Sequence, residues 1–283
     1  MANYAMVCDV EKCCGCHSCF LACKDEYVGS AHLPLTVEQG PDQQWLRVQE
    51  VEYGTDDKVK VDYIPILCQH CENPGCGRGA PEGAVYTRDD GIVVFDPEKA
   101  KGAKDIVNNC PYHVVFWNEE KQLPQKCTMC AHMLDAGEKT TRCVECCPTG
   151  ALIFGDLDDP DSDISKLIKE KGERLETYRP GFDATPRVRY LNLPKPFVTG
   201  ALCYADAPGE PPVDVKVTLT NRESGEKTEG LSDFMGDFQF KRLLSDADYV
   251  LRIEAPGYAL IEKAVHTNAS KNLGTITLEN QAG

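Results

Sequence analysis

The last third of the chain alternates between apolar and polar positions. Apolar side chains recur at every second position in three runs, and Gly, Asn and Asp residues lie between these runs. A period of two is typical of half-buried β-strands, and the intervening residues favour turns. The apolar positions are Val213, Val215, Val217 and Leu219, then Phe238 and Phe240, then Tyr249, Leu251 and Ile253. We therefore predict a small antiparallel β-sandwich or barrel over residues 197–283.

The middle of the chain, residues 156–196, has a different pattern. Between Ser165 and Leu175, good helix formers carry apolar residues at a spacing near 3.6, which predicts a helix. Four prolines then predict an extended connector: Pro180, Pro186, Pro194 and Pro196. Residues 1–155 have short apolar runs that are broken by Gly, Pro and many cysteines. The sequence thus predicts three parts: residues 1–155, 156–196 and 197–283.

The cysteine content narrows the class of protein. The chain has 16 cysteines, of which only Cys203 lies beyond Cys147. A disulfide-rich secreted protein would usually be much shorter and would begin with a signal peptide, and residues 1–6 have neither a basic start nor an apolar stretch. We therefore expect a cytoplasmic metal-binding protein, with the periplasm as the alternative if a signal-bearing partner exports the folded chain.

The charge and the hydropathy exclude two further classes. The formal net charge is −15, which argues against nucleic acid as a partner because phosphate binding needs a basic surface. No run of eighteen apolar residues occurs, so direct insertion into a membrane is not expected.

The first cysteine motif indicates iron–sulfur chemistry. Cys13, Cys16, Cys19 and Cys23 follow the spacing C-x2-C-x2-C-x3-C. In bacterial ferredoxins the first three cysteines of this run hold one 4Fe–4S cluster, and the fourth serves a second cluster. A zinc site needs only four ligands and typically uses two well-separated C-x2-C pairs, so this spacing suits a cluster better.

Three further groups of cysteines vary this motif. Cys127, Cys130, Cys143 and Cys147 make a complete motif that ends before Pro148. Cys68, Cys71 and Cys76 lack a fourth member, because Ala80 stands at the expected position. Cys110 precedes Pro111 like a fourth member, but the three positions before it at the motif spacing are apolar: Ala100, Ala103 and Ile106.

The rule that the fourth cysteine serves the other cluster of a pair resolves these groups. Each complete set takes three cysteines from one motif and one from its partner. The sets are Cys13, Cys16, Cys19 and Cys147; Cys127, Cys130, Cys143 and Cys23; and Cys68, Cys71, Cys76 and Cys110. A fourth set would consist of Ala80, Ala100, Ala103 and Ile106, here called the apolar set. The sequence therefore predicts three 4Fe–4S clusters, twelve cysteine ligands and no fourth cluster.

The segment before Cys110 must fill the space of the missing cluster. Ala100, Ala103 and Ile106 are spaced at three, which places them on one face of a helix. We expect residues 100–110 to close inward as a helix; the alternative is a solvated loop rich in lysine.

The remaining cysteines and the nearby histidines have simpler interpretations. Cys8, Cys14, Cys146 and Cys203 are expected to be core or neighbouring residues and not ligands. His17, His70 and His132 lie in or near complete motifs, so we expect them to support the ligands and not to replace them. No catalytic set of residues is found.

The four-motif layout of residues 4–195 resembles the iron–sulfur small subunits of the molybdopterin (dimethyl sulfoxide reductase-type) enzyme family. The strings Cys127-Thr-Met-Cys130-Ala-His132 and Cys147-Pro-Thr-Gly-Ala-Leu152 carry the resemblance. It implies an α+β fold with two ferredoxin-like iron–sulfur modules, and a large partner subunit that holds the molybdopterin cofactor. This chain would then be an electron-transfer subunit without a catalytic site of its own.

The missing cluster and the C-terminal part are most similar to one branch of that family, in which the large subunits act on aromatic hydroxyl compounds as transhydroxylases, hydroxylases or dehydroxylases. The string Glu82-Gly-Ala-Val-Tyr-Thr-Arg is similar to this branch. Residues 197–283 resemble a sandwich of the transthyretin or carboxypeptidase-regulatory type. Two alternatives stay open: the electron-transfer subunit of a respiratory molybdenum reductase for an inorganic acceptor, and a zinc-binding scaffold.

Overall fold

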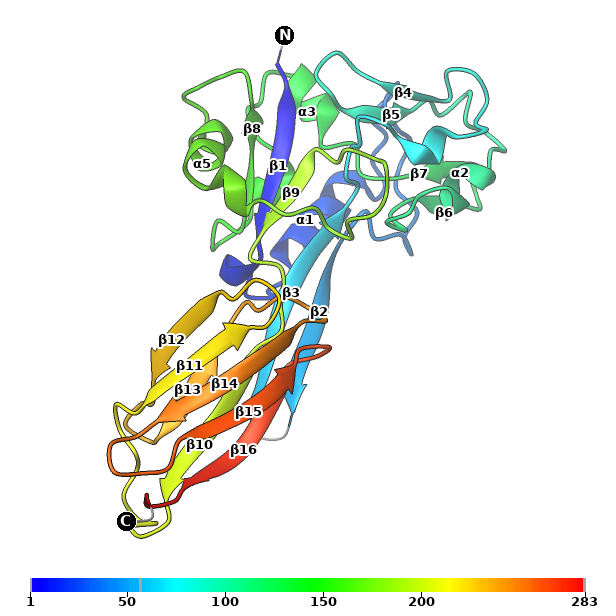
Figure 1. The fold of residues 1–283 in the computed structure, drawn as a ribbon. Coiled ribbons are helices and arrows are strands. Elements are labelled where there is room, and N and C mark those ends of the chain that lie inside the picture. The colour runs from blue at the N-terminus through cyan, green and yellow to red at the C-terminus, as the bar shows by residue number, and fades with distance from the viewer. Residues whose placement is uncertain (1, 56–57, 282–283) are drawn as a thin grey trace. The chain divides into compact units, whose positions relative to one another are not determined.

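β-strands predominate in the computed structural model, which describes residues 2–55 and 58–281 (Figure 1). The chain forms two units, one of residues 1–50 and 62–193 and the other of residues 51–61 and 194–283. The hairpin of β2 (Leu46–Thr55) and β3 (Lys58–Leu67) passes from the first unit into the second. The expected connector, residues 156–196, therefore lies almost entirely in the first unit, and part of a hairpin from the cysteine-rich region lies in the second.

The first unit combines short strands with short helices. Its other strands are β1 (Tyr4–Asp9), β4 (Val85–Thr87), β5 (Val93–Phe95), β6 (Phe116–Asn118), β7 (Leu123–Gln125), β8 (Leu152–Asp156) and β9 (Val188–Leu191). Its helices are α1 (Ser18–Tyr27), α2 (Asp105–Asn108), α3 (Ala131–Asp135), α4 (Arg142–Glu145) and α5 (Asp163–Lys171), with 3-10 turns η1 (Val10–Lys12), η2 (Gly75–Gly77) and η3 (Gly172–Arg174). Such short elements leave much of the chain in the loops that carry the cysteines.

A three-stranded sheet brings distant parts of the first unit together. β1 is its central strand, antiparallel to β8 and parallel to β9. The predicted helix near residue 165 is confirmed as α5, which begins where the Ser162 hydroxyl caps the amide of Ser165 at 3.2 Å. Ile164 at the start of α5 packs against Ala5 and Val7 of β1. The N-terminal strand is thus enclosed by segments from the end of the same unit.

The second unit consists of two sheets around one apolar core. One sheet has the order β13–β10–β16 and the other the order β12–β11–β14–β15. The strands are β10 (Val198–Tyr204), β11 (Lys216–Asn221), β12 (Lys227–Leu231), β13 (Asp237–Phe240), β14 (Asp248–Glu254), β15 (Ile261–His266) and β16 (Lys271–Leu278). The alternating residues of β11, β13 and β14 are buried in the shared core, which confirms these three predicted strands.

The expectation of a purely antiparallel arrangement is wrong at one pair. β10 and β16 run parallel, from the pairing of Val198 with Lys271 to that of Tyr204 with Leu278. A parallel pair needs a long crossover connection, and the strands between β10 and β16 supply it. Along the part of the chain that the structure describes, no helix has the length and apolar character needed to span a bilayer.

Candidate functional site

Three hollows in the first unit are each lined by four cysteines from one predicted set. We name them site 1, site 2 and site 3. Site 1 is lined by Cys13, Cys16, Cys19 and Cys147. Four cysteines from two separate motifs converge on this one hollow, which is the arrangement that an iron–sulfur cluster needs. The hollow is therefore a candidate cofactor site.

The local backbone of site 1 depends on residues that accept a left-handed conformation. Gly15 has a φ of +68°, and a Cβ atom there would lie 2.6 Å from the ring of Tyr63. His17, with a φ of 59°, directly precedes helix α1. These two turns bring Cys13, Cys16 and Cys19 to the same hollow, so glycine is required inside the motif.

Site 2 is lined by Cys23, Cys127, Cys130 and Cys143. Cys23 lies on α1 one turn after Cys19, which lines site 1. Because four residues of helix rise about 6 Å, α1 holds these two sites next to each other.

Site 3 is lined by Cys68, Cys71, Cys76 and Cys110. The first two cysteines follow β3, Cys76 lies in η2, and Cys110 follows α2. The structure therefore brings Cys110 to the other three cysteines across a gap of more than thirty residues. Each of the three predicted sets of four cysteines thus lines one hollow.

Burial and mutual repulsion disfavour the thiolate forms of cysteines at sites 2 and 3. Burial, then repulsion from Cys68 and Cys130, raises the pKa of Cys127 to about 12. Burial and the neighbouring cysteines likewise raise the pKa of Cys71 and of Cys76 to about 12. All four cysteines of site 2 are buried, and a bound metal would favour their thiolate forms because its positive charge compensates theirs.

Hydrogen bonds already point at some of the sulfur atoms. The amide of Met129 donates to Sγ of Cys127 at 3.3 Å. At Cys147 burial acts to raise the pKa, but amides that include those of Leu152 and Ala151 hold it below its ordinary value. Amide groups around a thiolate are the means by which proteins stabilise iron–sulfur clusters and set their potentials.

These observations fit a 4Fe–4S cluster better than a zinc ion. A structural zinc site typically takes its thiolates from two well-separated C-x2-C pairs, whereas each set here takes three cysteines from one motif and one from another. The donor sets and the amides near sulfur suit a cubane cluster.

The cysteines outside the three sets have varied surroundings. Cys8 is completely buried on β1, and burial raises its pKa strongly. Cys14 is exposed and also lines site 1, while the thiol of Cys146 lies 3.5 Å from the carbonyl of Cys143. In the second unit, Sγ of Cys203 lies 3.3 Å from the hydroxyl of Thr277.

The apolar set lies in a closed part of the first unit. Ala100 is completely buried and Ile106 is 1% exposed, whereas Ala80 and Ala103 are half-buried. The expected helix over residues 100–110 is wrong in extent, because only Asp105–Asn108 form α2. Gly102, with a φ of +81°, interrupts the helical path, and its amide donates to the carbonyl of Gln122 at 2.8 Å. Residues 97–102 are a turn, which is closer to the loop alternative.

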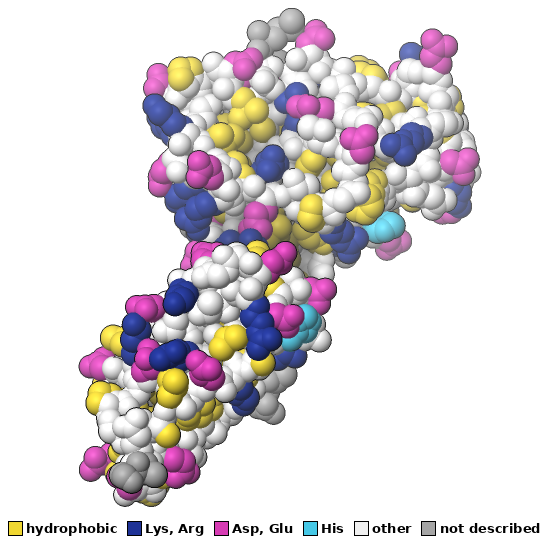
Figure 2. Space-filling view, in the orientation of Figure 1, with side chains coloured by type: hydrophobic (Ala, Val, Ile, Leu, Met, Phe, Trp, Pro, Cys, Tyr) yellow, Lys and Arg dark blue, Asp and Glu magenta, His cyan; other side chains and the backbone are white. Residues whose placement is uncertain are grey.

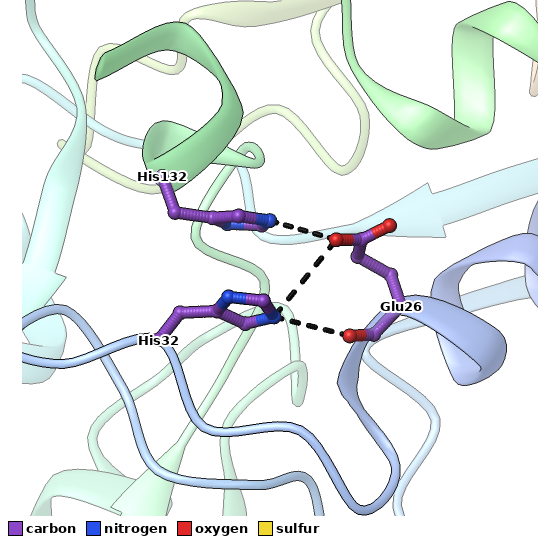
Figure 3. Close-up of side chains that lie close together, drawn as sticks. All are labelled: Glu26, His32 and His132. Atoms are coloured by element: carbon purple, nitrogen blue, oxygen red, sulfur yellow. Dashed lines mark hydrogen bonds and ion pairs between the residues drawn. The ribbon is translucent and has the colours of Figure 1, made fainter. Parts of the chain in front are cut away.

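A polar network that the sequence pattern does not predict lies beside site 2 (Figure 3). Glu26 on α1 accepts hydrogen bonds at 2.9 Å from Nε2 of His132 and at 2.8 Å from Nε of Arg142. His32 stacks on His132, with ring centroids 3.7 Å apart, and its Nε2 atom bonds the carbonyl of Glu26 at 3.1 Å. Nearly parallel rings cannot both direct their nitrogen atoms in plane at one ion, so this network joins helices α1, α3 and α4 and is not a metal site. Residues separated by about 110 positions give no local sequence signal.

Comparison with known proteins adds independent information. A family model described as a 4Fe-4S dicluster domain matches residues 59–157. The small subunit of pyrogallol hydroxytransferase from Pelobacter acidigallici is 37% identical to this chain, over 98% of the chain and 100% of that protein.

Other relatives match only part of the chain. One subunit of the tetrathionate reductase from Salmonella typhimurium is 36% identical over 70% of this chain and 75% of its own length. The iron–sulfur subunit of an arsenate respiratory reductase from Shewanella is 30% identical over 66% of this chain and 94% of its own length.

Proposed function

Because this chain belongs to the family of iron–sulfur small subunits of the molybdopterin enzymes, we propose that it holds three 4Fe–4S clusters and carries single electrons for a larger catalytic subunit. One observation carries the proposal: each of three hollows is lined by four cysteines that come from two separate motifs. When bound, a 4Fe–4S cluster accepts and releases one electron.

The residues of the chain hold, shield and space the clusters. Site 1 uses Cys13, Cys16, Cys19 and Cys147; site 2 uses Cys23, Cys127, Cys130 and Cys143; site 3 uses Cys68, Cys71, Cys76 and Cys110. Apolar side chains line the same hollows and exclude water: Val48 at site 1, Leu46 and Met129 at site 2, and Val114 and Val115 at site 3. A dry, fixed surrounding keeps the reorganisation that accompanies charge transfer small.

The geometry favours the linear order site 1, site 2, site 3. Helix α1 supplies Cys19 to site 1 and Cys23 to site 2. Cys68 of site 3 is close enough to Cys127 of site 2 to raise its pKa, after burial the largest effect there. Electrons that enter at one end would thus pass through site 2.

The nature of the partner is the finer part of the proposal. The relative that this chain matches over its full length is named as the small subunit of a pyrogallol hydroxytransferase. We therefore assign a molybdopterin-containing large subunit that acts on aromatic hydroxyl compounds, in the cytoplasm, with this chain as a noncatalytic subunit that neither enters the membrane nor binds nucleic acid. Acidic and basic side chains are interspersed on the face drawn in Figure 2, and the net charge of −15 suits a basic or amide-rich surface on the partner. At the level of fold, we propose a pair of ferredoxin-like modules and a transthyretin-like sandwich.

Metal analysis tests the proposal directly. The chain, purified without oxygen together with its large subunit, should contain about twelve iron atoms and twelve acid-labile sulfides. About sixteen of each would contradict the assignment of the apolar set, and zinc without sulfide would contradict the clusters altogether. Turnover of an inorganic sulfur or arsenic acceptor, and not of a phenolic compound, would replace the proposed substrate class with that of a respiratory reductase.

A further inference from the structure

Lys126 is buried, and it is not one of the residues that the sequence predicts to bind a cluster. It lies directly before Cys127, and only 3% of its surface is exposed. Lysine is almost never fully buried without a partner, because removing an ammonium group from water is costly. The groups around Lys126 must therefore stabilise its buried ammonium group.

The ammonium group of Lys126 lies between site 2 and site 3. Nζ donates to the carbonyl of Cys127, which lines site 2, at 3.1 Å. It also donates to the carbonyl of Val93, which lines site 3. The ring of Phe95 lies beneath it, with 5.0 Å from Nζ to the ring centroid. One cation is thus bonded to the walls of both hollows.

None of the carboxylates in the described ranges, residues 2–55 and 58–281, forms an ion pair with Lys126. The nearby His70 is completely buried, and its Nδ1 atom accepts a hydrogen bond from the amide of Val93 at 3.1 Å. The groups placed to balance the charge of Lys126 are therefore the cysteine ligands of sites 2 and 3, because its ammonium group is bonded to the walls of both.

We propose that Lys126 is the shared counter-charge of sites 2 and 3 and raises the reduction potentials of the clusters at both. The inference rests on the proposed function, since it needs the clusters. Each reduction adds one electron and one negative charge to a site, and no bond forms or breaks. A fixed cation beside the site stabilises the reduced form more than the oxidised form, so the potential rises. Site 1 has no such contact with Lys126 and should not respond.

Lys126→Met tests this proposal, because methionine keeps the apolar stem and removes the charge. Lys126→Arg keeps the charge, and Lys104→Met is the matched control: Lys104 also lies over an aromatic ring, 5.4 Å from the centroid of Trp117, but is paired with Glu119 at 3.2 Å and exposed. The complex is first analysed for iron and sulfide, then titrated with dithionite without oxygen and followed by electron paramagnetic resonance.

We expect two of the three one-electron steps in Lys126→Met to shift about tenfold toward the oxidised form, which equals about 59 mV for one electron. The third step should stay in place, and Lys126→Arg and Lys104→Met should shift none of them more than about threefold. If Lys126→Met fails to assemble clusters at two sites and Lys126→Arg assembles them, the required charge is still demonstrated.

Three results would overturn the proposal. Three unchanged potentials in Lys126→Met would refute it and leave the proposed function intact. Equal cluster loss in Lys126→Met and Lys126→Arg would assign Lys126 to packing alone. Absence of iron and sulfide from the wild-type complex would remove the proposed function and this inference together.

Discussion

Site 3 and the apolar set are neighbouring parts of one unit that follow the same motif spacing but differ in structure: site 3 is a hollow lined by cysteines, and the apolar set is closed. At site 3, four cysteines line one hollow. In the apolar set, Ala100 and Ile106 are buried, and the turn at Gly102 closes the segment by a hydrogen bond to Gln122. The side-chain amide of Asn109 ties the two stretches together by donating to the carbonyl of Arg78 at 2.7 Å.

The comparison shows what a cluster site needs besides ligands. A hollow is kept where four cysteines line it, and the segment folds closed around Ala100 and Ile106 where all four ligand positions are apolar. Because Cys110 follows the apolar segment and yet lines site 3, the segment has to close without moving this cysteine. The loss of one site is therefore compatible with the retention of its neighbour.

The largest expected effect comes from removing Cys110, which should abolish the cluster of site 3. In Cys110→Ser, iron analysis should fall from about twelve to about eight atoms per chain, because three remaining thiolates hold a cubane poorly. Cys203→Ser in the second unit is the control and should keep the full content. Loss of a different cluster in Cys110→Ser would show that the cysteine sets are paired wrongly.

Ile106→Ala tests the packing of the apolar set and should lower the free energy of unfolding by about 2–4 kcal/mol, because it opens a cavity in a buried site. The midpoint of anaerobic chemical unfolding gives this value, and iron content should not change. Val107→Ala next to it removes a side chain that is only half-buried and should cost less. Equal effects of the two substitutions would mean that Ile106 does not fill the space of a lost cluster.

Gly102→Ala tests whether the closing turn depends on a left-handed residue. We expect a loss of about 1 kcal/mol from strain alone, because φ is positive and an added Cβ atom would meet nothing within 4 Å. Gly209→Ala also adds a Cβ atom in open space, but Gly209 does not have a positive φ and should show almost no change. Thermal unfolding of the two variants side by side would show whether the strain exists.

The smallest expected effect concerns the tie between the two stretches. Asn109→Ala removes the hydrogen bond to Arg78 and should lower the free energy of unfolding by about 0.5–1 kcal/mol. All three clusters should stay, since Cys110 is held independently by the hollow it lines. Loss of the site 3 cluster in this variant would mean that the two stretches are one cooperative structure and not two neighbours.

Much of this structure was readable from periodicity and spacing. The alternation in residues 213–253 predicted three strands that the structure confirms, and the helical pattern near residue 165 predicted α5. The resemblance to molybdopterin-family small subunits is confirmed by a relative that matches the full length. The cysteine groups match the lining of the three hollows, and ligation by these residues stays a prediction.

The missed features depend on contacts that leave no local pattern. The parallel pairing of β10 with β16 requires knowledge of where distant strands meet, and the network of Glu26, His32 and His132 joins two helices that are far apart in the sequence. The helix predicted over residues 100–110 is longer than α2. The spacing of three between Ala100, Ala103 and Ile106 favours a helix, but Gly102 has a positive φ and breaks it. From the sequence alone Lys126 would be expected at the surface, as lysines usually are, but in the structure it is buried.

Site 1 is formed by cysteines from the beginning and the end of the first unit, so the order of translation determines when the site is complete. Cys13, Cys16 and Cys19 are made early, but Cys147 and the strands that flank β1 follow more than a hundred residues later. At about 5–20 residues per second, the ribosome needs on the order of ten seconds to supply them. During this interval the first motif has three thiols and no completed site, so cluster insertion into site 1 has to follow the synthesis of the whole unit. A nascent chain exposed to oxygen would be most vulnerable at these three cysteines.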